Sequence, residues 1–415
     1  MKFFRWLYPG IGIKRWVVLA AFGLGMMVIV GFSAVKTISQ HSVLLASFAC
    51  ALLFFGIFLV YTALKHIVRI FVRALMPVPS EDLANIVYQS RKRDFLARGP
   101  RVVVVGGGTG LSVLLQGIKT YTNNITAIVT VTDTGGSSGR LRDELDILPP
   151  GDIRNCLVAL ADAEPLIRDL FQYRFQEGEG LKGHSFGNLF ITALSMVTGD
   201  FEKAIRESSK VLAIRGRVLP STLDKVTLVG EFADGTTAEG ETSITAARKP
   251  LKRIALRPSN CRATDETLEA IQNADLIVMG PGSLYTSIIP NLLIKDIVNA
   301  ILESDAYKVY VINAMTQPGE TEGYTAEDHL RALISHTDPG IINACYVNTQ
   351  SIPKTVLERY QDSHSYPVDV DLAKIREQGY EVVGGEILRI DGQVRHDSAK
   401  LAKGIIDLYF DILRR

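Results

Sequence analysis

The chain has 415 residues, which is enough for two or three domains, and carries 45 basic and 44 acidic side chains. Because these charges balance, the composition does not indicate a nucleic-acid partner. The four cysteines lie far apart and form neither a disulfide framework nor a zinc-binding pattern, as expected in a reducing compartment.

Two uncharged apolar stretches dominate the first hundred residues. Residues 16–35 and 43–62 are each long enough to cross the ~30 Å hydrocarbon core of a membrane as a helix. Only the short segment KTISQHS joins them, so they are predicted to form a transmembrane hairpin within a membrane anchor of residues 1–76. A cleaved signal peptide is the alternative, but the first stretch is too long for one and a second follows at once.

The basic residues around these stretches predict their orientation. The joining segment carries only Lys36 and His41, whereas the outer ends carry Lys2, Arg5, Lys14, Arg15, Lys65, Arg69 and Arg73. Positively charged flanks stay on the cytoplasmic side. The sequence therefore predicts a multi-pass protein of the cell membrane, with both termini and the soluble domain in the cytoplasm.

A short connecting region, residues 77–100, follows the anchor. Two prolines are predicted to end the second apolar helix, and Ser80 is a suitable N-cap for an amphipathic helix over residues 81–98. The basic run at residues 91–93 would attract lipid headgroups, the alternative being a solvated helix face. A Gly-Pro pair then marks the start of the soluble domain, residues 101–415.

From residue 101 onward, apolar runs typical of strands alternate with segments of helical periodicity. The expected strands are 101–105, 125–132, 275–280, 308–313, 343–348 and 381–388, and the main expected helices are 110–121, 152–163, 187–198 and 397–413. This alternation predicts an α/β fold, a Rossmann-like doubly wound parallel sheet that binds ligands beyond the carboxyl ends of its strands. Asp234 and Gly235 predict a hairpin and a small β-rich insertion over residues 225–244.

The segment RVVVVGGGTGLS runs from the first expected strand through a glycine-rich turn into a helix. Gly107, Gly108, Thr109 and Gly110 allow close approach of the backbone to a ligand, and the first N–H groups of a helix form an anion site. The spacing departs from the dinucleotide fingerprint, because Leu111 stands where its third glycine belongs. We interpret the turn as a site for a phosphate-bearing ligand, with a purely structural turn as the alternative.

The second expected strand leads into the loop TDTGGSSG. Asp133 is placed to hold a metal ion or a ligand hydroxyl and is the candidate catalytic residue, while Gly136, Ser137 and Ser138 supply hydrogen-bond donors. A nicotinamide-binding domain would place an acid here for its ribose, but it needs no second phosphate cradle. The loop therefore suits a nucleotide diphosphate, the alternative being a flexible surface loop.

The segment LPPGDIRN contributes three further candidates. Asp152 is expected to cap a helix that begins at Ile153, and Arg154 and Asn155 follow in its first turn. The helix dipole disfavours a cation there, and a bound anion would offset that cost. An ion pair of Arg154 with Asp152 or Asp143 explains the arginine equally well.

Two more loops complete the predicted site. The loop MGPGSLYTS combines close backbone approach, a hydroxyl donor and a ring for stacking on a base or sugar, offered by Gly280, Gly282, Ser283 and Tyr285. The loop GHSFGNLF adds His184 and Asn188, a loop histidine without a role being the alternative. Because glycine turns follow three strands of one sheet, they are predicted to surround a single crevice. The sequence contains no P-loop and no HExxH motif.

Together with NAMTQPGETEGYTAEDHL at residues 313–330, these loops resemble the gluconeogenesis factor family (YvcK-like) over about residues 101–410. That family is similar in fold to 2-phospho-L-lactate transferase, which moves a phospholactyl group from a guanosine diphosphate-linked donor to a deazaflavin. The resemblance implies a Rossmann-like domain that binds a UDP-sugar, notably UDP-N-acetylglucosamine. It also implies an influence on cell shape and cell-wall precursor flux, with no catalysed reaction firmly attached.

The resemblance implies roles for particular residues. The diphosphate would be cradled by residues 107–110, Gly282 and Ser283, and the sugar or base would meet Asn188 and Tyr285.

Two departures from the family pattern bear on function. Asp133 stands where the transferases keep an acidic residue near the acceptor or a metal, but Thr134 follows it where a second acid or an asparagine is common. This departure weakens a metal-dependent transferase. The usual family members begin near Arg101, so the membrane hairpin is an addition.

The sequence leaves three functional hypotheses. The leading one is a membrane-tethered UDP-sugar sensor or regulator with no resident metal, an unidentified regulatory protein partner and the option of a homo-oligomer. The second is a transferase of the 2-phospho-L-lactate type, which would use Asp133 and Mg²⁺. The third is a nicotinamide-dependent oxidoreductase, against which the off-pattern glycine turn argues.

Overall fold

The computed structural model describes residues 13–37, 43–75, 91, 94–361 and 364–414. The chain divides into two compact units, Met1–Ser90 and Arg91–Arg415, and each is described by itself. Several predicted features lie outside the described residues: the turn at 38–42, Lys2, Arg5, most of the helix over 81–98, Lys92 and Arg93.

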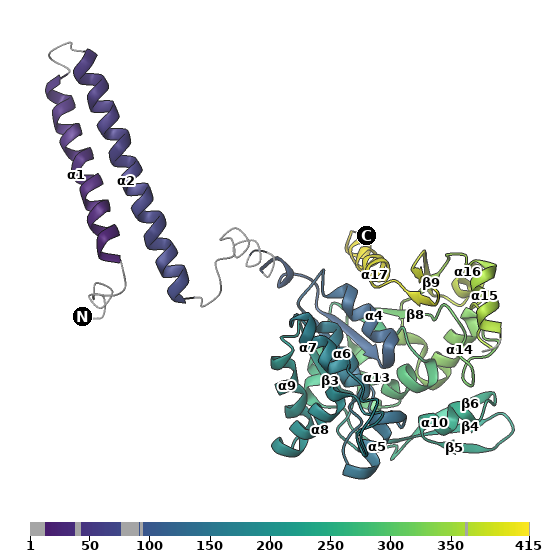
Figure 1. Cartoon of the computed structure of the whole chain (residues 1–415). Coiled ribbons are helices and arrows are strands. Elements are labelled where there is room, and N and C mark those ends of the chain that lie inside the picture. The colour runs from purple at the N-terminus through teal and green to yellow at the C-terminus, as the bar shows by residue number, and fades with distance from the viewer. Residues whose placement is uncertain (1–12, 38–42, 76–90, 92–93, 362–363, 415) are drawn as a thin grey trace. The chain divides into compact units, whose positions relative to one another are not determined.

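The first unit is a pair of neighbouring helices, α1 (Ile13–Thr37) and α2 (Val43–Leu75), which confirms both predicted helices (Figure 1). They come close where Gly23 faces Gly56, since a Cβ atom on Gly23 would lie 2.9 Å from the Gly56 carbonyl oxygen. Small residues at such a contact let two apolar helices pack closely. The rings of Trp16 and His66 also stack between the helices, with centroids 3.9 Å apart.

Among the described residues, one stretch of helix is long and apolar enough to cross a membrane. It is Ser47–Ile70, with a mean hydropathy of 2.2, and it lies later in the chain than the predicted span at 43–62. The apolar part of α1, Arg15–Gly31, is shorter, so one candidate span is found where the sequence predicts two. Phe22 is 61% exposed and Phe54 is 71% exposed, so the helix pair leaves much apolar surface uncovered.

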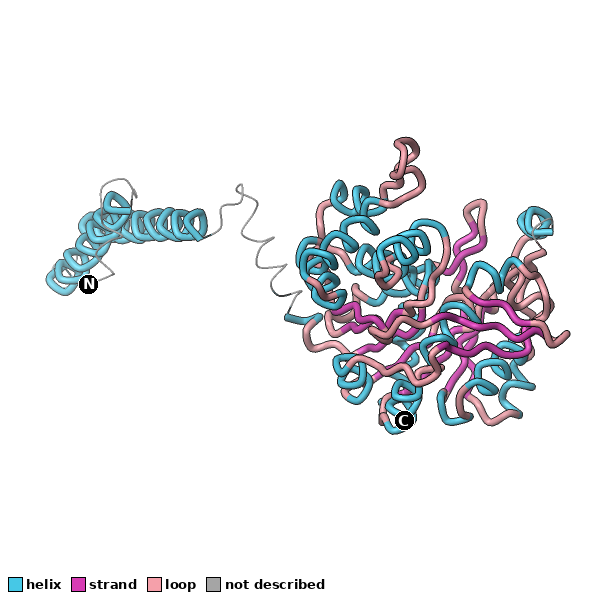
Figure 2. Tube along the Cα trace, turned by 90° about the horizontal axis from the view of Figure 1, so that it is seen from below, coloured by secondary structure: helices cyan, strands magenta, loops and turns pink. Residues whose placement is uncertain are grey.

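The second unit is built on a seven-stranded parallel sheet of order β10-β9-β8-β7-β1-β2-β3 (Figure 2). Its strands are β1 (Val102–Gly106), β2 (Ile125–Val129), β3 (Arg217–Pro220), β7 (Leu276–Met279), β8 (Tyr307–Val311), β9 (Ala344–Asn348) and β10 (Glu381–Gly385). The chain starts at the centre, builds outward through β2 and β3, and returns to the other side of β1 at β7. This order confirms the predicted doubly wound fold and places its switch point between β1 and β7.

Helices cover both faces of this sheet (Figure 2). The helices of this unit outside the small inserted sheet are α4 (Gly108–Ile118), α5 (Gly136–Leu145), α6 (Gly151–Leu160), α7 (Pro165–Gln172), α8 (Phe186–Thr198), α9 (Phe201–Val211), α11 (Asp265–Gln272), α12 (Ile289–Leu292), α13 (Lys295–Glu303), α14 (Ala326–His336), α15 (Lys354–Gln361), α16 (Leu372–Glu377) and α17 (Ser398–Leu413). The apolar face expected of the first helix is confirmed, since Leu111, Leu114, Leu115 and Ile118 of α4 are fully buried. Residues 102–105 are at most 2% exposed, as expected of a central strand covered on both faces.

A small antiparallel sheet is inserted between the two halves of the fold. It contains β4 (Thr227–Phe232), β5 (Thr237–Glu239) and β6 (Leu251–Arg257) in the order β5-β4-β6, and α10 (Glu241–Ala246) packs on it. Asp234 accepts the N–H of Thr236 at 2.9 Å, and Gly235 closes the turn with a φ of 81°. The predicted hairpin is confirmed, although the insertion extends past residue 244 to include β6.

Three elements differ from the sequence prediction. The edge strand β3 is unexpected, because its four residues include an arginine and a proline and show no apolar period. The second half of the loop TDTGGSSG, residues 136–139, is the start of α5, whose N-cap is Gly135. The strand expected over 381–388 is shorter in the structure, where β10 ends at Gly385. A hairpin of β11 (Leu388–Ile390) and β12 (Val394–His396) follows it.

Candidate functional site

A cleft of about 640 Å³ lies at the carboxyl ends of the strands, at the switch point between β1 and β7. This position is where open α/β sheets bind their ligands. We call it the switch-point cleft, and it is lined by residues 107–110, Val113, Asp133, Asp152, Asn155, Glu241, residues 281–283, Ser287, residues 313–318, Ser365 and residues 394–396.

The cleft brings together nine of the candidate residues from four separate loops. They are Gly107, Gly108, Thr109, Gly110, Asp133, Asp152, Asn155, Gly282 and Ser283. The other eight candidates do not line it, namely Gly136, Ser137, Ser138, Arg154, His184, Asn188, Gly280 and Tyr285. The glycine turns after β1 and β7 therefore face a common space, whereas the serines after β2 lie outside it.

The glycine turn after β1 presents its N–H groups to an acid. Gly108 is the first residue of α4 and has a φ of 66°, a backbone conformation that favours glycine. Its N–H donates a hydrogen bond to the carboxylate of Asp152. A Cβ atom on Gly107 would lie only 2.5 Å from Oδ2 of that same carboxylate. The helix N-terminus therefore holds a carboxylate at the position predicted to hold an anion.

Asp152 does not cap its own helix, which corrects the sequence prediction. The helix α6 begins at Gly151 with Pro150 as its N-cap, so Asp152 already lies in the first turn. From there its side chain reaches across to the turn after β1. Two prolines ahead of Gly151 set the start of the helix two residues earlier than the side-chain pattern indicates.

Asp133 is fixed by its own loop. Its Oδ1 accepts the N–H of Gly135 at 2.7 Å. Its Oδ2 would lie 2.9 Å from a Cβ atom on Gly151, at the start of α6. Asp133 and Asp152 are thereby held on neighbouring sides of the switch-point cleft.

Acidic side chains in and near the cleft have raised pKa values. Burial, and then the charge of Asp133, raise the pKa of Asp152 to about 7. Burial, and then Asp133 and Asp152, raise the pKa of Glu241 to about 8. Burial also raises the pKa of Glu320 to about 7, although the hydroxyl of Thr286 donates to its Oε1 at 3.1 Å. The negative charges of these carboxylates repel one another, so it is unfavourable for all of them to be ionised at once. Their protonation near neutral pH therefore changes the charge of the cleft.

We expect binding of an anionic ligand in this cleft to weaken between pH 6 and pH 8. Because the pKa values of Asp152 and Glu241 are about 7 and 8, both carboxyls are mostly neutral at pH 6 and ionise as the pH rises. The folded chain also binds more protons than the unfolded chain over this range, so its stability falls in the same direction.

Calorimetric titration of the full chain with UDP at both pH values measures this effect. Asp152→Asn, which cannot ionise, should flatten the dependence. A wild-type affinity that increases with pH would contradict the assignment.

Ser137, His184 and Asn188 form a buried network, and the ligand contacts predicted for them stay a prediction. The Oγ of Ser137 lies 3.0 Å from Nδ1 of His184 and accepts the Nδ2 hydrogen of Asn188 at 3.1 Å. All three residues are at most 4% exposed. The network joins the start of α5 to the start of α8 and does not place Asn188 in contact with the cleft.

Tyr285 and Arg154 also lie away from the cleft. Tyr285 is 2% exposed, its hydroxyl lies 2.8 Å from that of Tyr324, and its ring packs edge-on against His336. The expected stacking of this ring on a base or sugar is therefore not supported. Arg154 donates to Oδ1 of Asn155 at 2.8 Å. Among the described residues it forms no ion pair with either aspartate considered from the sequence.

Arg395 and Glu241 line the cleft but were not found from the sequence. Arg395 lies on β12 and is exposed, and its guanidinium donates to the side-chain oxygen of Gln393. Among the described residues that line the cleft, it is the only lysine or arginine. Glu241 is the first residue of α10, in the insertion. Neither residue directly follows a strand of the main sheet, so the sequence pattern does not associate them with the loops at its carboxyl edge.

The acids of the cleft do not form a complete metal site. Among the described residues, no group of three or more histidines, cysteines, aspartates or glutamates is placed to hold a metal ion. Mg²⁺ prefers six oxygen ligands and is commonly held by one or two carboxylates together with phosphates of a bound substrate. Asp133 and Asp152 fit only that second arrangement.

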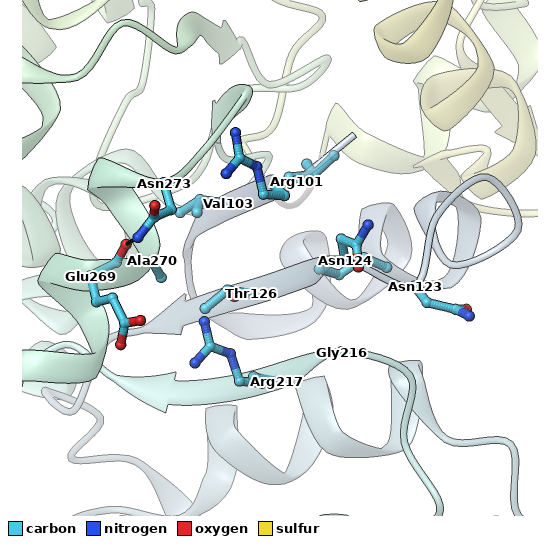
Figure 3. A pocket seen from close by; sticks show the side chains of 12 residues that line it. Arg101, Val103, Asn123, Asn124, Thr126, Gly216, Arg217, Glu269, Ala270 and Asn273 are labelled. Atoms are coloured by element: carbon cyan, nitrogen blue, oxygen red, sulfur yellow. Dashed lines mark hydrogen bonds between the residues drawn. The ribbon is translucent and has the colours of Figure 1, made fainter. Parts of the chain in front are cut away.

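A second cavity, of about 590 Å³, lies at the opposite edge of the sheet, where β1, β2 and β3 begin (Figure 3). Arg101 on its wall donates to Oδ1 of Asp275 at 2.6 Å. Asn124 donates to the carbonyl oxygens of Ala97 and Gly99 at 2.9 and 2.8 Å. These polar groups hold the edge of the domain together. The glycine of its described lining, Gly216, precedes β3 and does not follow the carboxyl end of a strand, so we place the candidate site in the switch-point cleft.

Comparisons with known proteins agree with this fold and these motifs. Residues 102–388 match the family model for 2-phospho-L-lactate transferase CofD. The gluconeogenesis factor of Bacillus subtilis is 48% identical over 314 residues, which cover 75% of this chain and 99% of that protein. The gluconeogenesis factor of Halalkalibacterium halodurans is 52% identical over 307 residues, covering 74% of this chain and 95% of that protein.

A longer relative and a solved structure extend the comparison. A protein of Clostridium acetobutylicum is 43% identical over 425 residues, covering 99% of this chain and 93% of its own length. That match takes in the helical N-terminal unit, which is therefore shared with at least one longer relative. The crystal structure of a UPF0052 family member from Bacillus halodurans is 50% identical and has a TM-score of 0.73, covering 74% of this chain and 99% of that one.

Proposed function

The chain belongs to the gluconeogenesis factor family, and from this premise we propose that it is a membrane-tethered sensor of a UDP-sugar. The ligand we propose is UDP-N-acetylglucosamine, and the proposed role is the regulation of cell shape and cell-wall precursor metabolism. An unidentified regulatory protein would bind the ligand-bound form of the chain. The homo-oligomer considered from the sequence stays a prediction.

The observation that carries the proposal is the make-up of the switch-point cleft. Its 640 Å³ fall within the usual range of ligand pockets, roughly 300–1,000 Å³. Two glycine turns line the cleft, the first of them at the N-terminus of α4, and Arg395 adds one guanidinium, which together suit the oxygens of a diphosphate. Asp133 lines the same cleft, and in our proposal it accepts a hydrogen bond from a sugar or ribose hydroxyl. The neighbouring acids repel an anion that lacks hydroxyl groups. The hydroxyl-bearing part of the ligand therefore has to contribute to its affinity.

A sensor accounts for the cleft better than an enzyme does. Among the described residues that line it, no serine or threonine hydroxyl is hydrogen-bonded to a histidine, as an activated nucleophile would be. The described residues contain two Ser–His contacts, Ser137 with His184 and Ser335 with His336, and neither serine lines the cleft.

The first unit supports a tether. Ser47–Ile70 is long and apolar enough to span a bilayer, and its partner helix packs on it through the Gly23 and Gly56 contact. We propose that both helices insert, with both termini and the second unit in the cytoplasm. The large apolar side chains exposed on the pair would then contact lipid instead of water.

A transferase is the second candidate, and two observations favour it. The family model that matches residues 102–388 is that of 2-phospho-L-lactate transferase. Asp133 and Asp152 also face the same cleft, where they would hold Mg²⁺ together with the phosphates of a nucleotide diphosphate-linked donor. The bound metal ion would neutralise the negative charge of the phosphates.

Asp133→Asn distinguishes the two candidates. In a sensor, losing a charge-assisted hydrogen bond to a ligand hydroxyl costs ~1.5–3 kcal/mol, or roughly ten- to hundredfold in affinity. In a transferase, the change should leave nucleotide affinity nearly unchanged and abolish turnover. We expect the first result in calorimetry of the full chain in detergent with UDP-N-acetylglucosamine, with and without Mg²⁺.

Asp338→Asn is the matched control for this measurement. Asp338 makes the same kind of turn, with its Oδ1 accepting the N–H of Gly340 at 2.8 Å, but it lies outside the cleft. Unchanged affinity in Asp133→Asn, together with loss of phospholactyl or sugar transfer, would reject the sensor.

A further inference from the structure

A smaller cavity, of about 350 Å³, adjoins the switch-point cleft at the carboxyl ends of β8 and β9. The two cavities share Asn313 and Ala314 as a common wall. Asn313 is fixed there, since its Nδ2 donates to the carbonyl oxygen of Gly282 at 2.8 Å and its Oδ1 accepts the Gly282 N–H at 3.3 Å. A ligand whose diphosphate lies at the glycine turns would therefore reach this second space directly.

The chemistry of the smaller cavity differs from that of the cleft. Among the described residues that line it there is no charged side chain, and we call it the amide pocket. Its lining is residues 312–314, 347–352, 367, 368, 370 and 372. Apolar surface comes from Val347, Ile352 and Leu372, and polar groups come from amides and hydroxyls. This mixture suits an uncharged ring that carries hydroxyl or amide groups, and it does not suit a phosphate.

The loop after β9 holds its polar groups in defined positions. Asn348 donates to the carbonyl oxygen of Gln350 at 2.9 Å, and its Oδ1 accepts the Gln350 N–H at 3.2 Å. The side-chain oxygen of Gln350 accepts the N–H of Leu388 at 3.1 Å. That bond fixes the orientation of the Gln350 amide and leaves its NH₂ group for a ligand. The hydroxyl of the exposed Ser351 lies next to it in the chain.

We propose that the amide pocket binds the glycosyl group of the nucleotide diphosphate sugar. This inference rests on the proposed function of the switch-point cleft. Asp133 follows β2, on one side of the switch point, whereas the amide pocket follows β8 and β9, on the other side. The nucleoside and the sugar leave the diphosphate in opposite directions, so the ribose lies toward Asp133 and the sugar lies in the amide pocket. Gln350 donates to a hydroxyl or acyl oxygen of that sugar.

The test compares UDP-N-acetylglucosamine with UDP on the full chain in detergent by calorimetry. Gln350→Met removes the NH₂ donor at similar volume, and we expect about a five- to tenfold loss of UDP-N-acetylglucosamine affinity. Ser351→Trp, on an exposed loop, fills the rim and should lower that affinity further. Neither variant should change the affinity for UDP. Gln272→Leu, an exposed glutamine of α11 outside both cavities, is the control.

The other outcomes overturn the proposal in distinguishable ways. Equal losses for UDP and UDP-N-acetylglucosamine would show that the pocket holds the nucleoside or only supports the fold, and melting temperatures would separate these two cases. No change with either ligand would show that the sugar lies elsewhere. The proposal holds if the wild-type chain binds UDP-N-acetylglucosamine and both variants lose affinity for this ligand but keep their affinity for UDP. If the wild type bound neither ligand, the proposed function itself would fail.

Discussion

Replacing Arg395 with alanine is expected to weaken UDP-N-acetylglucosamine binding by about ten- to hundredfold. Among the described residues that line the switch-point cleft, Arg395 supplies the only lysine or arginine charge, whereas Asp133, Asp152 and Glu241 line the same cleft. A hydrogen bond to a charged group contributes ~1.5–3 kcal/mol, and here the remaining carboxylates would repel the diphosphate once the guanidinium is gone. Arg395→Lys keeps the charge but loses the planar fork, so it should restore only part of the affinity.

Arg389→Ala is the matched control for this prediction. Arg389 stands directly opposite Arg395 in the β11–β12 hairpin and forms an ion pair with Asp391 at 2.8 Å, but it does not line the cleft. Its removal should leave binding nearly unchanged. Equal losses in Arg389→Ala and Arg395→Ala would mean that the hairpin acts through its fold or through general charge, and the assigned contact would be wrong.

Adding a single methyl group at Gly110 is expected to damage both the fold and the cleft. A Cβ atom there would lie 2.6 Å from the carbonyl oxygen of Pro281 and 3.1 Å from Cα of Gly282. These are backbone atoms, so the turn after β7 has to move away from the turn after β1. Overpacking of this kind costs ~1–3 kcal/mol of stability, and the separated turns would no longer present their N–H groups to one diphosphate.

Gly282→Ala on the facing turn isolates the steric cause. Its Cβ atom would lie 3.4 Å from the carbonyl oxygen of Gly107, an ordinary contact, although Gly282 lines the same cleft. Thermal unfolding and calorimetry should therefore show a large loss for Gly110→Ala and a small one for Gly282→Ala. If the two variants lost stability and affinity equally, the close approach of the turns would not explain the need for glycine.

The fold could be predicted because its strongest signals are local and repeated. The apolar run at residues 102–105 and the helical spacing from Leu111 to Ile118 both describe burial, and both are buried in the structure. The start of α5 could not be predicted, since Gly135 caps it without a side-chain bond and small residues fill its first turn. Likewise β3 is held by its pairing with β2, which leaves little trace in four residues.

The site was only partly predictable, because a loop sequence does not show which side chains turn inward. Ser283 faces the cleft, but Tyr285, two residues later, lies in a π-helical turn over Leu284–Ile288 that directs its ring toward Tyr324. Asn188 similarly faces Ser137, from the first turn of α8. Arg395 reaches the cleft from a hairpin near the end of the chain, and only the folded arrangement brings it to β1.

The central claim is that the switch-point cleft binds a UDP-sugar, and a calorimetric titration of the full chain in detergent tests it most directly. UDP-N-acetylglucosamine should bind saturably at one site per chain and be displaced by UDP, while GDP and NADH bind far more weakly. Thermal stabilisation should follow the measured affinity. Saturable binding of GDP or NADH, with no binding of UDP-N-acetylglucosamine, would contradict the account.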